Sequence, residues 1–170
     1  MKKGKHRTSN IEHPTSNGVV VWTLNDGNGG RKYDLEERLL EFASAIIDLS
    51  EKLPNSRAGN HIAGQVLRSG TAPYPNHGEA EDAESREDFI HKLKLCLKEL
   101  RETRRWGRLI KRKAWANDET VLVFILGEAD ELIRIFYSSI QTARKNLIAE
   151  RRKPKDRTDW LDVGCSMLDV

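Results

Sequence analysis

Apolar and small residues recur in alternating steps of four and three along the stretch from Glu87 to Lys113. This spacing predicts one long helix with a buried face, because residues three and four apart share one side of an α-helix. The buried face consists of Phe89, Leu93, Cys96, Leu100, Thr103, Gly107 and Ile110. At about 100° per residue, a second set of side chains falls almost opposite this face, and all of them are cationic. This set is the cation row: Lys94, Lys98, Arg101, Arg105, Arg108 and Arg112.

The same spacing predicts a first helix and a last helix on either side of this segment. The first helix is predicted to begin near Asp34, whose side chain can cap it, and to end at Pro54. The last helix is predicted to begin at a cap formed by Asn117 or Asp118. The predicted buried faces are Leu35, Leu39, Phe42, Ile46, Leu49 and Leu53 in the first helix, and Leu122, Ile125, Ala129, Leu132, Phe136, Ile140, Ala143 and Leu147 in the last.

The second helix is predicted to begin after Ser56 as N-cap and to be interrupted by two prolines. Pro73 and Pro75 each lack an N–H and crowd the preceding turn, so we expect a break or kink there. Asn76 is expected to open a second, acidic helical piece. Ser85 is a good N-cap for the long helix that follows.

Four amphipathic helices joined by short turns predict an all-α protein, an antiparallel up-down-up-down four-helix bundle with flexible N- and C-terminal tails. The expected division is a flexible leader at 1–32, the bundle at 33–150 and a basic tail at 151–170. Within the leader, Val19–Leu24 is β-prone but has no evident partner strand. We therefore predict a mostly disordered leader, with the alternative that this run lies against a neighbouring chain.

The composition indicates the cellular location of the protein more clearly than it indicates the function. The chain has 170 residues, which suits one domain with tails, and its net charge of +3 is too small to identify a partner. Two cysteines give no disulfide framework, and Cys96 falls on a buried face. The sequence has neither an apolar signal segment nor a long apolar run. We expect a soluble cytoplasmic protein without a membrane partner.

Motifs for enzymatic chemistry are missing from the sequence. Di-iron bundles need two Glu-x-x-His pairs, whereas this chain offers only Asp88-x-x-His91. Walker-type loops, Gly-x-Ser-x-Gly elbows and Cys-x-x-Cys pairs do not occur. The sequence therefore predicts no catalytic residues, no metal site, no cofactor and no enzymatic activity.

Several segments in a fixed order carry a resemblance to a known family. They are Leu67–Thr71 (LRSGT), Asn76–Ala80 (NHGEA), Glu84–Leu93 (ESREDFIHKL) and Lys98–Thr103 (KELRET), with Trp106 following. Together they resemble the four-helix bundle proteins related to the 23S rRNA intervening-sequence-encoded protein. The likeness extends from about Tyr33 to Lys145 and leaves both tails uncovered.

The resemblance implies a four-helix protomer that assembles into a ring-like homopentamer with a basic surface suited to nucleic acid. The same family includes the accessory variability determinant of diversity-generating retroelements, so a reverse transcriptase is an implied partner. One departure concerns the second helix. Family members usually have a single proline before the asparagine, whereas Pro73 and Pro75 flank Tyr74 here.

The cation row is the strongest functional signal in the sequence. Lys92–Lys113 holds ten Lys or Arg residues against only Glu99 and Glu102, so few pairs can form within the helix. This imbalance favours contact with the phosphates of RNA or DNA. The alternative is a pure protein-interaction or assembly module whose row faces acidic surfaces. Trp106 and Trp115 are near enough to stack on bases, but their spacing favours half-buried packing.

A second cluster, Arg68, Asn76 and Glu79, favours a structural role. An amide and a carboxylate beside the interrupted helix can satisfy backbone groups freed by the prolines, and we expect Arg68 to pair with Glu79. Glu99 and Glu102 are expected to bond an arginine of an adjacent helix. These five residues form the family motif and are predicted to be structural.

Overall fold

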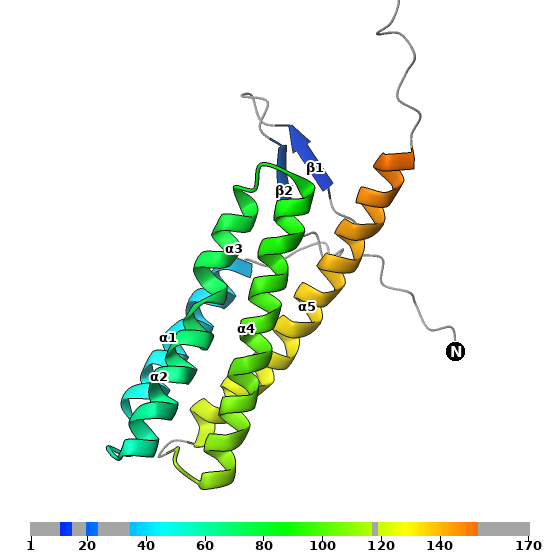
Figure 1. Cartoon of the computed structure of the whole chain (residues 1–170). Coiled ribbons are helices and arrows are strands. Elements are labelled where there is room, and N and C mark those ends of the chain that lie inside the picture. The colour runs from blue at the N-terminus through cyan, green and yellow to red at the C-terminus, as the bar shows by residue number, and fades with distance from the viewer. Residues whose placement is uncertain (1–10, 15–19, 24–34, 117–118, 153–170) are drawn as a thin grey trace, which may run out of the picture.

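A computed structural model describes residues 11–14, 20–23, 35–116 and 119–152. Its elements, in chain order, are β1 (Ile11–Pro14), β2 (Val20–Thr23), α1 (Leu35–Glu51), α2 (Arg57–Thr71), α3 (Pro73–Glu81), α4 (Arg86–Lys113) and α5 (Glu119–Arg152). Helices α2 and α3 follow one another along a single side of the molecule, so the helices form a four-helix bundle (Figure 1). The predicted all-α four-helix bundle is confirmed.

The predicted buried faces form the core of this bundle. Every predicted residue of the α4 face is buried, and the α5 face is buried from Leu122 to Ala143 with Leu147 partly covered. Phe42 of α1 and Phe136 of α5 are both 0% exposed. Burying a side chain of this size stabilises a fold by about 1.5–3 kcal/mol. The periodic apolar positions therefore account for which side of each helix is buried.

Ion pairs define the direction of α4 relative to α5. Arg86 Nη2 lies 2.6 Å from Glu150 Oε1, and Arg104 Nη1 lies 2.7 Å from Asp130 Oδ1. Residue numbers rise along α4 while those of its partners fall along α5. The two helices are therefore antiparallel.

The interruption in the second bundle element lies at Ala72, between α2 and α3. Ala72 has helical dihedral angles (φ −60°, ψ −32°), so the chain changes helix without leaving the helical region. The prediction that Asn76 opens the second piece is wrong, because α3 already begins at Pro73. Proline is well tolerated in a first turn, where N–H groups lack intrahelical partners. Asn76 instead donates its backbone N–H (3.2 Å) and its side-chain Nδ2 (2.8 Å) to the Ala72 carbonyl.

Two of the predicted helix caps are confirmed. Ser56 Oγ accepts a hydrogen bond from the Gly59 N–H at 3.1 Å, and Ser85 Oγ accepts one from the Asp88 N–H at 3.1 Å. Each bond satisfies one of the N–H groups that a helix start leaves open. The other predicted caps lie outside the described residues: Asp34, Asn117 and Asp118.

The leader contains a strand pair that the sequence analysis did not predict. Strands β1 and β2 are antiparallel, with Ile11 opposite Thr23 and Pro14 opposite Val20, and β2 lies against α3. The prediction that the β-prone run has no partner strand is therefore wrong. A four-residue partner that ends in proline carries little strand signal, which explains the miss. The rest of the leader, and the tail at 153–170, lie outside the described residues.

Cys96 gives a direct test of how tightly α4 packs on α3. Its side chain is 0% exposed, Sγ lies 3.6 Å from the Pro73 carbonyl oxygen, and burial raises the pKa of the thiol to about 12. In a Cys165→Ser variant, we expect iodoacetamide at about pH 8 to alkylate the native protein at least about 100-fold more slowly than the urea-unfolded protein, because the thiolate is the reacting form. Mass spectrometry of timed samples measures both rates. Equal rates would mean that the junction of α3 and α4 opens readily.

Candidate nucleic-acid interface

Helix α4 displays the cation row on its outer face. All six members are exposed, as the spacing predicts. Lys98 Nζ lies 3.6 Å from the Oε1 atom of the adjacent Glu99. In the described part of the chain, no carboxylate lies within 4.0 Å of the charged nitrogens of the other five. Most of the positive charge of the row is therefore not neutralised by nearby carboxylates.

Cations of α4 that face neighbouring helices behave differently. Lys92 Nζ lies 2.6 Å from Glu79 Oε2 of α3, and this hydrogen bond raises the pKa of the Lys92 ammonium group. Arg104 pairs with Asp130 of α5. Carboxylates of α3 and α5 thus neutralise Lys92 and Arg104, whereas no neighbouring helix in the described residues supplies a carboxylate to the cation row.

The family-motif residues form two separate clusters. Arg68 of α2 lies 3.4 Å from Glu99 and 2.5 Å from Glu102 of α4. The expectation that these glutamates bond an arginine of an adjacent helix is confirmed. The predicted Arg68–Glu79 pair is wrong, because Glu79 lies one helix further along and pairs with Lys92. Together with the Asn76 bond to Ala72, these contacts give the motif residues structural partners.

The two tryptophans near the cation row are half-buried packing residues, as predicted. Trp106 packs against the core, and its Nε1 donates to Glu102 at 3.3 Å. Trp115 also packs against the core, with Lys113 Nζ 5.8 Å from its ring centroid. Neither ring is fully exposed for stacking on a base.

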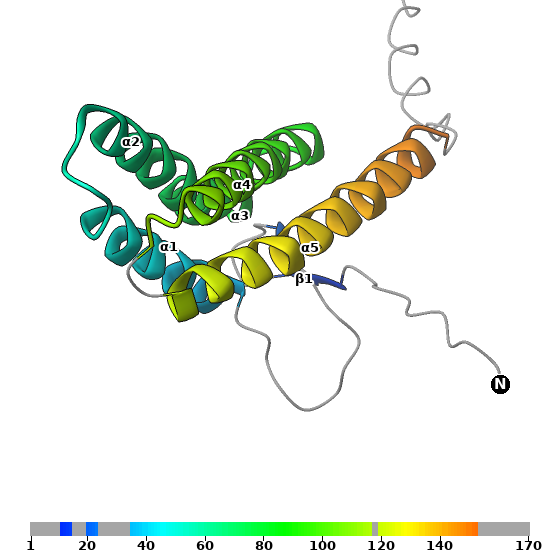
Figure 2. The same cartoon turned by 90° about the horizontal axis from the view of Figure 1, so that it is seen from below.

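A groove of about 870 Å³ lies between α4 and α5. Helix α5 diverges from α4 toward its C-terminal end (Figure 2). The α5 residues that line the groove lie in the C-terminal half of this helix. Its cations are Lys94, Lys98, Arg101 and Arg105 from α4 and Arg144 from α5. Its apolar lining is Leu97, Trp106, Leu109, Tyr137 and Ile140. Glu102 and Gln141 complete it.

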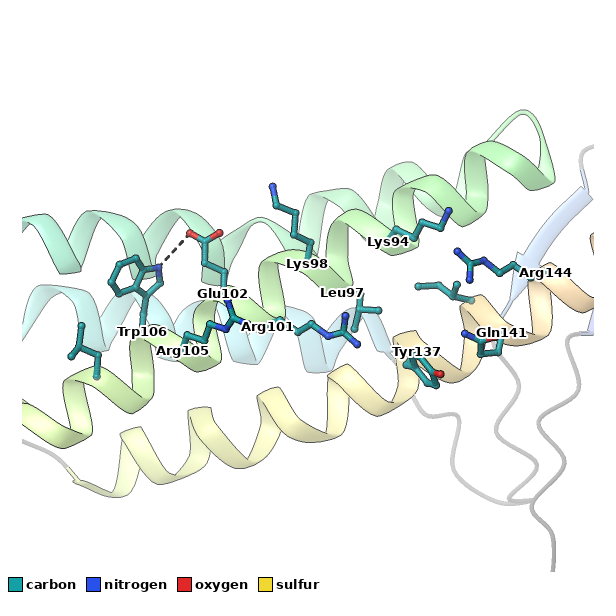
Figure 3. Close-up of a pocket in the computed structure, with 12 residues that line it drawn as sticks. Lys94, Leu97, Lys98, Arg101, Glu102, Arg105, Trp106, Tyr137, Gln141 and Arg144 are labelled. Carbon is teal, nitrogen blue, oxygen red and sulfur yellow. Dashed lines mark hydrogen bonds between the residues drawn. The ribbon is translucent and has the colours of Figure 1, made fainter.

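Helix α5 contributes site residues that the sequence analysis missed. Tyr137, Gln141 and Arg144 lie beside the cation row, and their side chains are visible along the groove in Figure 3. They repeat the four-three spacing of the buried face of α5, on a neighbouring side of the helix. This spacing marks one stripe, but no local signal says that the stripe lies beside the cations of α4.

A second hollow, of about 710 Å³, lies near the C-terminal end of α4. Arg108 and Arg112 border it together with Arg105, Leu109 and Lys111. Arg105 therefore borders both hollows, while Arg108 and Arg112 border only the second of these two. The cation row is one stripe in sequence but serves two adjoining surfaces.

The described residues contain neither a candidate metal site nor a helix that could span a membrane. No three or more His, Cys, Asp or Glu side chains there gather where they could hold a metal ion. His91, which follows Asp88 in the single motif-like pair, is exposed on α4 and does not point into the core. Among the described helices, none is long and apolar enough to cross a membrane. The absence of a cofactor and of catalysis stays a prediction.

Comparison with known proteins places this fold in a family. The family model for the 23S rRNA-intervening sequence protein matches residues 31–138, more than half of the chain. A crystal structure from Bacteroides thetaiotaomicron VPI-5482, of a protein with unknown function from the S23 ribosomal protein family, is similar to this chain. It shares 37% sequence identity with a TM-score of 0.58, over 64% of this chain and 99% of that chain. No curated protein matches the chain.

The matched span begins just before α1 and ends within α5. It therefore contains the whole cation row and Tyr137, but neither Gln141 nor Arg144. The resemblance found in the sequence motifs is confirmed. The chain belongs to the 23S rRNA-intervening sequence protein family.

Proposed function

We propose that this protein is a non-enzymatic basic scaffold that binds RNA or DNA through the cation row. One observation carries the proposal. Lys92 and Arg104, on the sides of α4, have carboxylate partners from neighbouring helices, whereas five of the six row members have none within ion-pair distance in the described residues. A row of like charges along one helix is unfavourable by itself, and the phosphates of a polyanion offset this repulsion.

The dimensions of the row suit a nucleic-acid backbone. From Lys94 to Arg112 the helix rises roughly 27 Å, at about 1.5 Å per residue. One strand of duplex DNA carries a phosphate about every 3.4 Å along the axis, so the row extends beside about eight phosphates. Contacts of this kind position a protein on nucleic acid but read little sequence. We therefore expect binding with weak sequence preference.

The proposal includes self-assembly into a homo-oligomer, specifically a cytoplasmic homopentamer. Family membership supports it, as do apolar side chains left exposed on α1 and α5, among them Leu40 (43%), Ile47 (46%) and Val123 (55%). Repeating the row around a ring would turn modest attraction per subunit into avidity. A reverse transcriptase as protein partner, in a retroelement accessory role, rests on the family resemblance alone.

A pure protein-interaction or assembly module is the second candidate. The outer face of α1 supports it, because Leu40 and Ile47 are exposed there beside the acidic side chains of Glu37, Glu41 and Asp48. An acidic, partly apolar face complements a basic one. In that case the row of one subunit would contact α1 of another, and nucleic acid would not be bound.

Filter binding to structured RNA and to duplex DNA, at about 50 mM and about 200 mM NaCl, separates the two candidates. With six phosphate contacts we expect the affinity to fall about 10³-fold between these concentrations, because each contact releases a counterion. No affinity at low salt, or an affinity indifferent to salt, would exclude the phosphate contacts. The assembly module instead predicts a molar mass by light scattering that falls as salt rises, without nucleic-acid binding.

A further inference from the structure

The groove between α4 and α5 combines two linings that a nucleic-acid duplex would not use together. Its rim is cationic, while its floor includes Leu97 (7% exposed) and Ile140 (3% exposed). On the α5 side, Tyr137 remains 52% exposed, although it is a large aromatic residue. A duplex presents phosphates outward and keeps the faces of its bases stacked, so it would leave the apolar part of this groove unused.

Three of the groove's five cations point toward the space between α4 and α5. Lys94 of α4 and Arg144 of α5 point toward one another, and Arg101 of α4 points toward the α5 side (Figure 3). In the described part of the chain, no carboxylate lies within ion-pair distance of these three side chains. Glu102, the carboxylate in the lining, is already bonded to Arg68. Like charges facing each other favour an anion between them.

Tyr137 is the residue that favours single-stranded nucleic acid over a duplex in this groove. Its side chain lies on the groove side of α5, near Arg101 and Gln141 (Figure 3). Aromatic side chains beside a cationic groove bind single strands by stacking on bases, and this stacking tolerates any sequence because every base has a π-face. A single strand can turn its phosphates to the rim and its bases to the floor. It can therefore satisfy both linings at once.

We infer that this groove is a binding site for single-stranded nucleic acid, in which Lys94, Arg101 and Arg144 contact the phosphates and Tyr137 stacks on a base. The inference rests on the proposed nucleic-acid function and adds the strand class to it. It also adds Tyr137 and Arg144 of α5 to a site that the sequence analysis limited to α4.

Fluorescence anisotropy of the full chain tests the inference with a labelled oligothymidylate of about 20 nucleotides and a duplex of the same length. Replacing Tyr137→Leu keeps an apolar side chain but removes the ring. We expect it to weaken single-strand binding about fivefold or more, and to leave duplex binding unchanged. Tyr137→Phe should retain wild-type affinity. Phe124→Leu, on the same helix and 44% exposed outside the groove, is the matched control and should have no effect.

The salt dependence of the affinity measures the phosphate contacts separately from the stacking. Arg144→Gln should reduce the slope of log K against log salt by about 0.7 for the single strand, the value expected for one lost contact. Arg152→Gln removes the same charge from the exposed C-terminal end of α5, outside both hollows and outside the cation row, and serves as its control. Photocrosslinking with a 5-iodouridine oligonucleotide should place the adduct on the tryptic peptide of residues 135–144, which carries Tyr137.

Distinct outcomes separate failure of the groove from failure of the proposed function. If Tyr137→Leu and Phe124→Leu behave alike, or duplex binds while single strands do not, the groove is not a single-strand site and the cation row remains. If neither nucleic acid binds at low salt, both proposals fail. A change of molar mass in the Tyr137→Leu or Arg144→Gln variant would show that a second copy of the chain covers the groove, which overturns the inference.

Discussion

Replacing Arg101, Arg105 and Arg108 together by glutamine is expected to weaken binding to duplex DNA about 500-fold at about 0.1 M salt. Each lost phosphate contact lowers log K by about 0.9 for every tenfold of salt below 1 M, and three are removed. All three side chains are exposed and none has a carboxylate partner within ion-pair distance in the described residues, so folding should not depend on them. Filter binding measures the affinity, and far-ultraviolet circular dichroism measures the helix content.

A control with the same change in net charge isolates the position of the cations. Arg134, Arg151 and Arg152 are exposed on α5 and lie outside both hollows. Changing them together to glutamine should leave affinity nearly unchanged. Equal weakening in both triple variants would mean that net charge, and not the row, attracts the nucleic acid. Loss of helix content in the first variant would make its arginines structural.

Gly59→Ala is expected to destabilise the protein by about 3 kcal/mol, a change at the upper end for overpacking. A Cβ atom at residue 59 would lie 1.9 Å from the Pro54 carbonyl oxygen and 3.2 Å from Ser56 Oγ. The obstacle is backbone, which cannot rotate away as a flexible side chain can. The turn between α1 and α2 would have to move, and the Ser56 cap would move with it. Thermal unfolding should show a midpoint lowered by about 6–12 °C.

Gly64→Ala, in the same helix, is the matched control with the opposite sign. A Cβ atom at residue 64 meets nothing within 4 Å. Alanine is favoured over glycine in a helix interior by about 0.8–1 kcal/mol, so this variant should be more stable than the wild type. A midpoint that falls in both variants would contradict the tight turn at Pro54 as the cause.

Patterns within short stretches of the sequence predicted the buried faces, two helix caps and the exposed cation row of the structure. The four-three spacing placed the buried faces around residues such as Phe42 and Phe136, because a helix buries whatever recurs at its own period. The sequence predicts Ser56 and Ser85 as caps because a capping side chain bonds a backbone N–H only three residues away. The exposure of the cation row followed from its angle to the α4 buried face.

Contacts between distant parts of the chain could not be predicted in this way. Arg68 meets Glu102 and not Glu79 because the packing of α2 and α3 on α4 sets which turns lie side by side. The partner strand β1 is short and ends at Pro14, so its weak local signal becomes meaningful only when paired with β2.

The sequence by itself determined the helices, their caps, their buried sides and the row of cations on α4, since each depends on residues within a turn or two of one another. Only the tertiary structure decided that α5 diverges beside that row and brings Tyr137 and Arg144 to it. The register and angle between two helices depend on how all their side chains pack together, and no local pattern encodes this sum. For that reason the sequence alone predicts the cation row, and only the packing of α5 beside α4 makes it one wall of a groove.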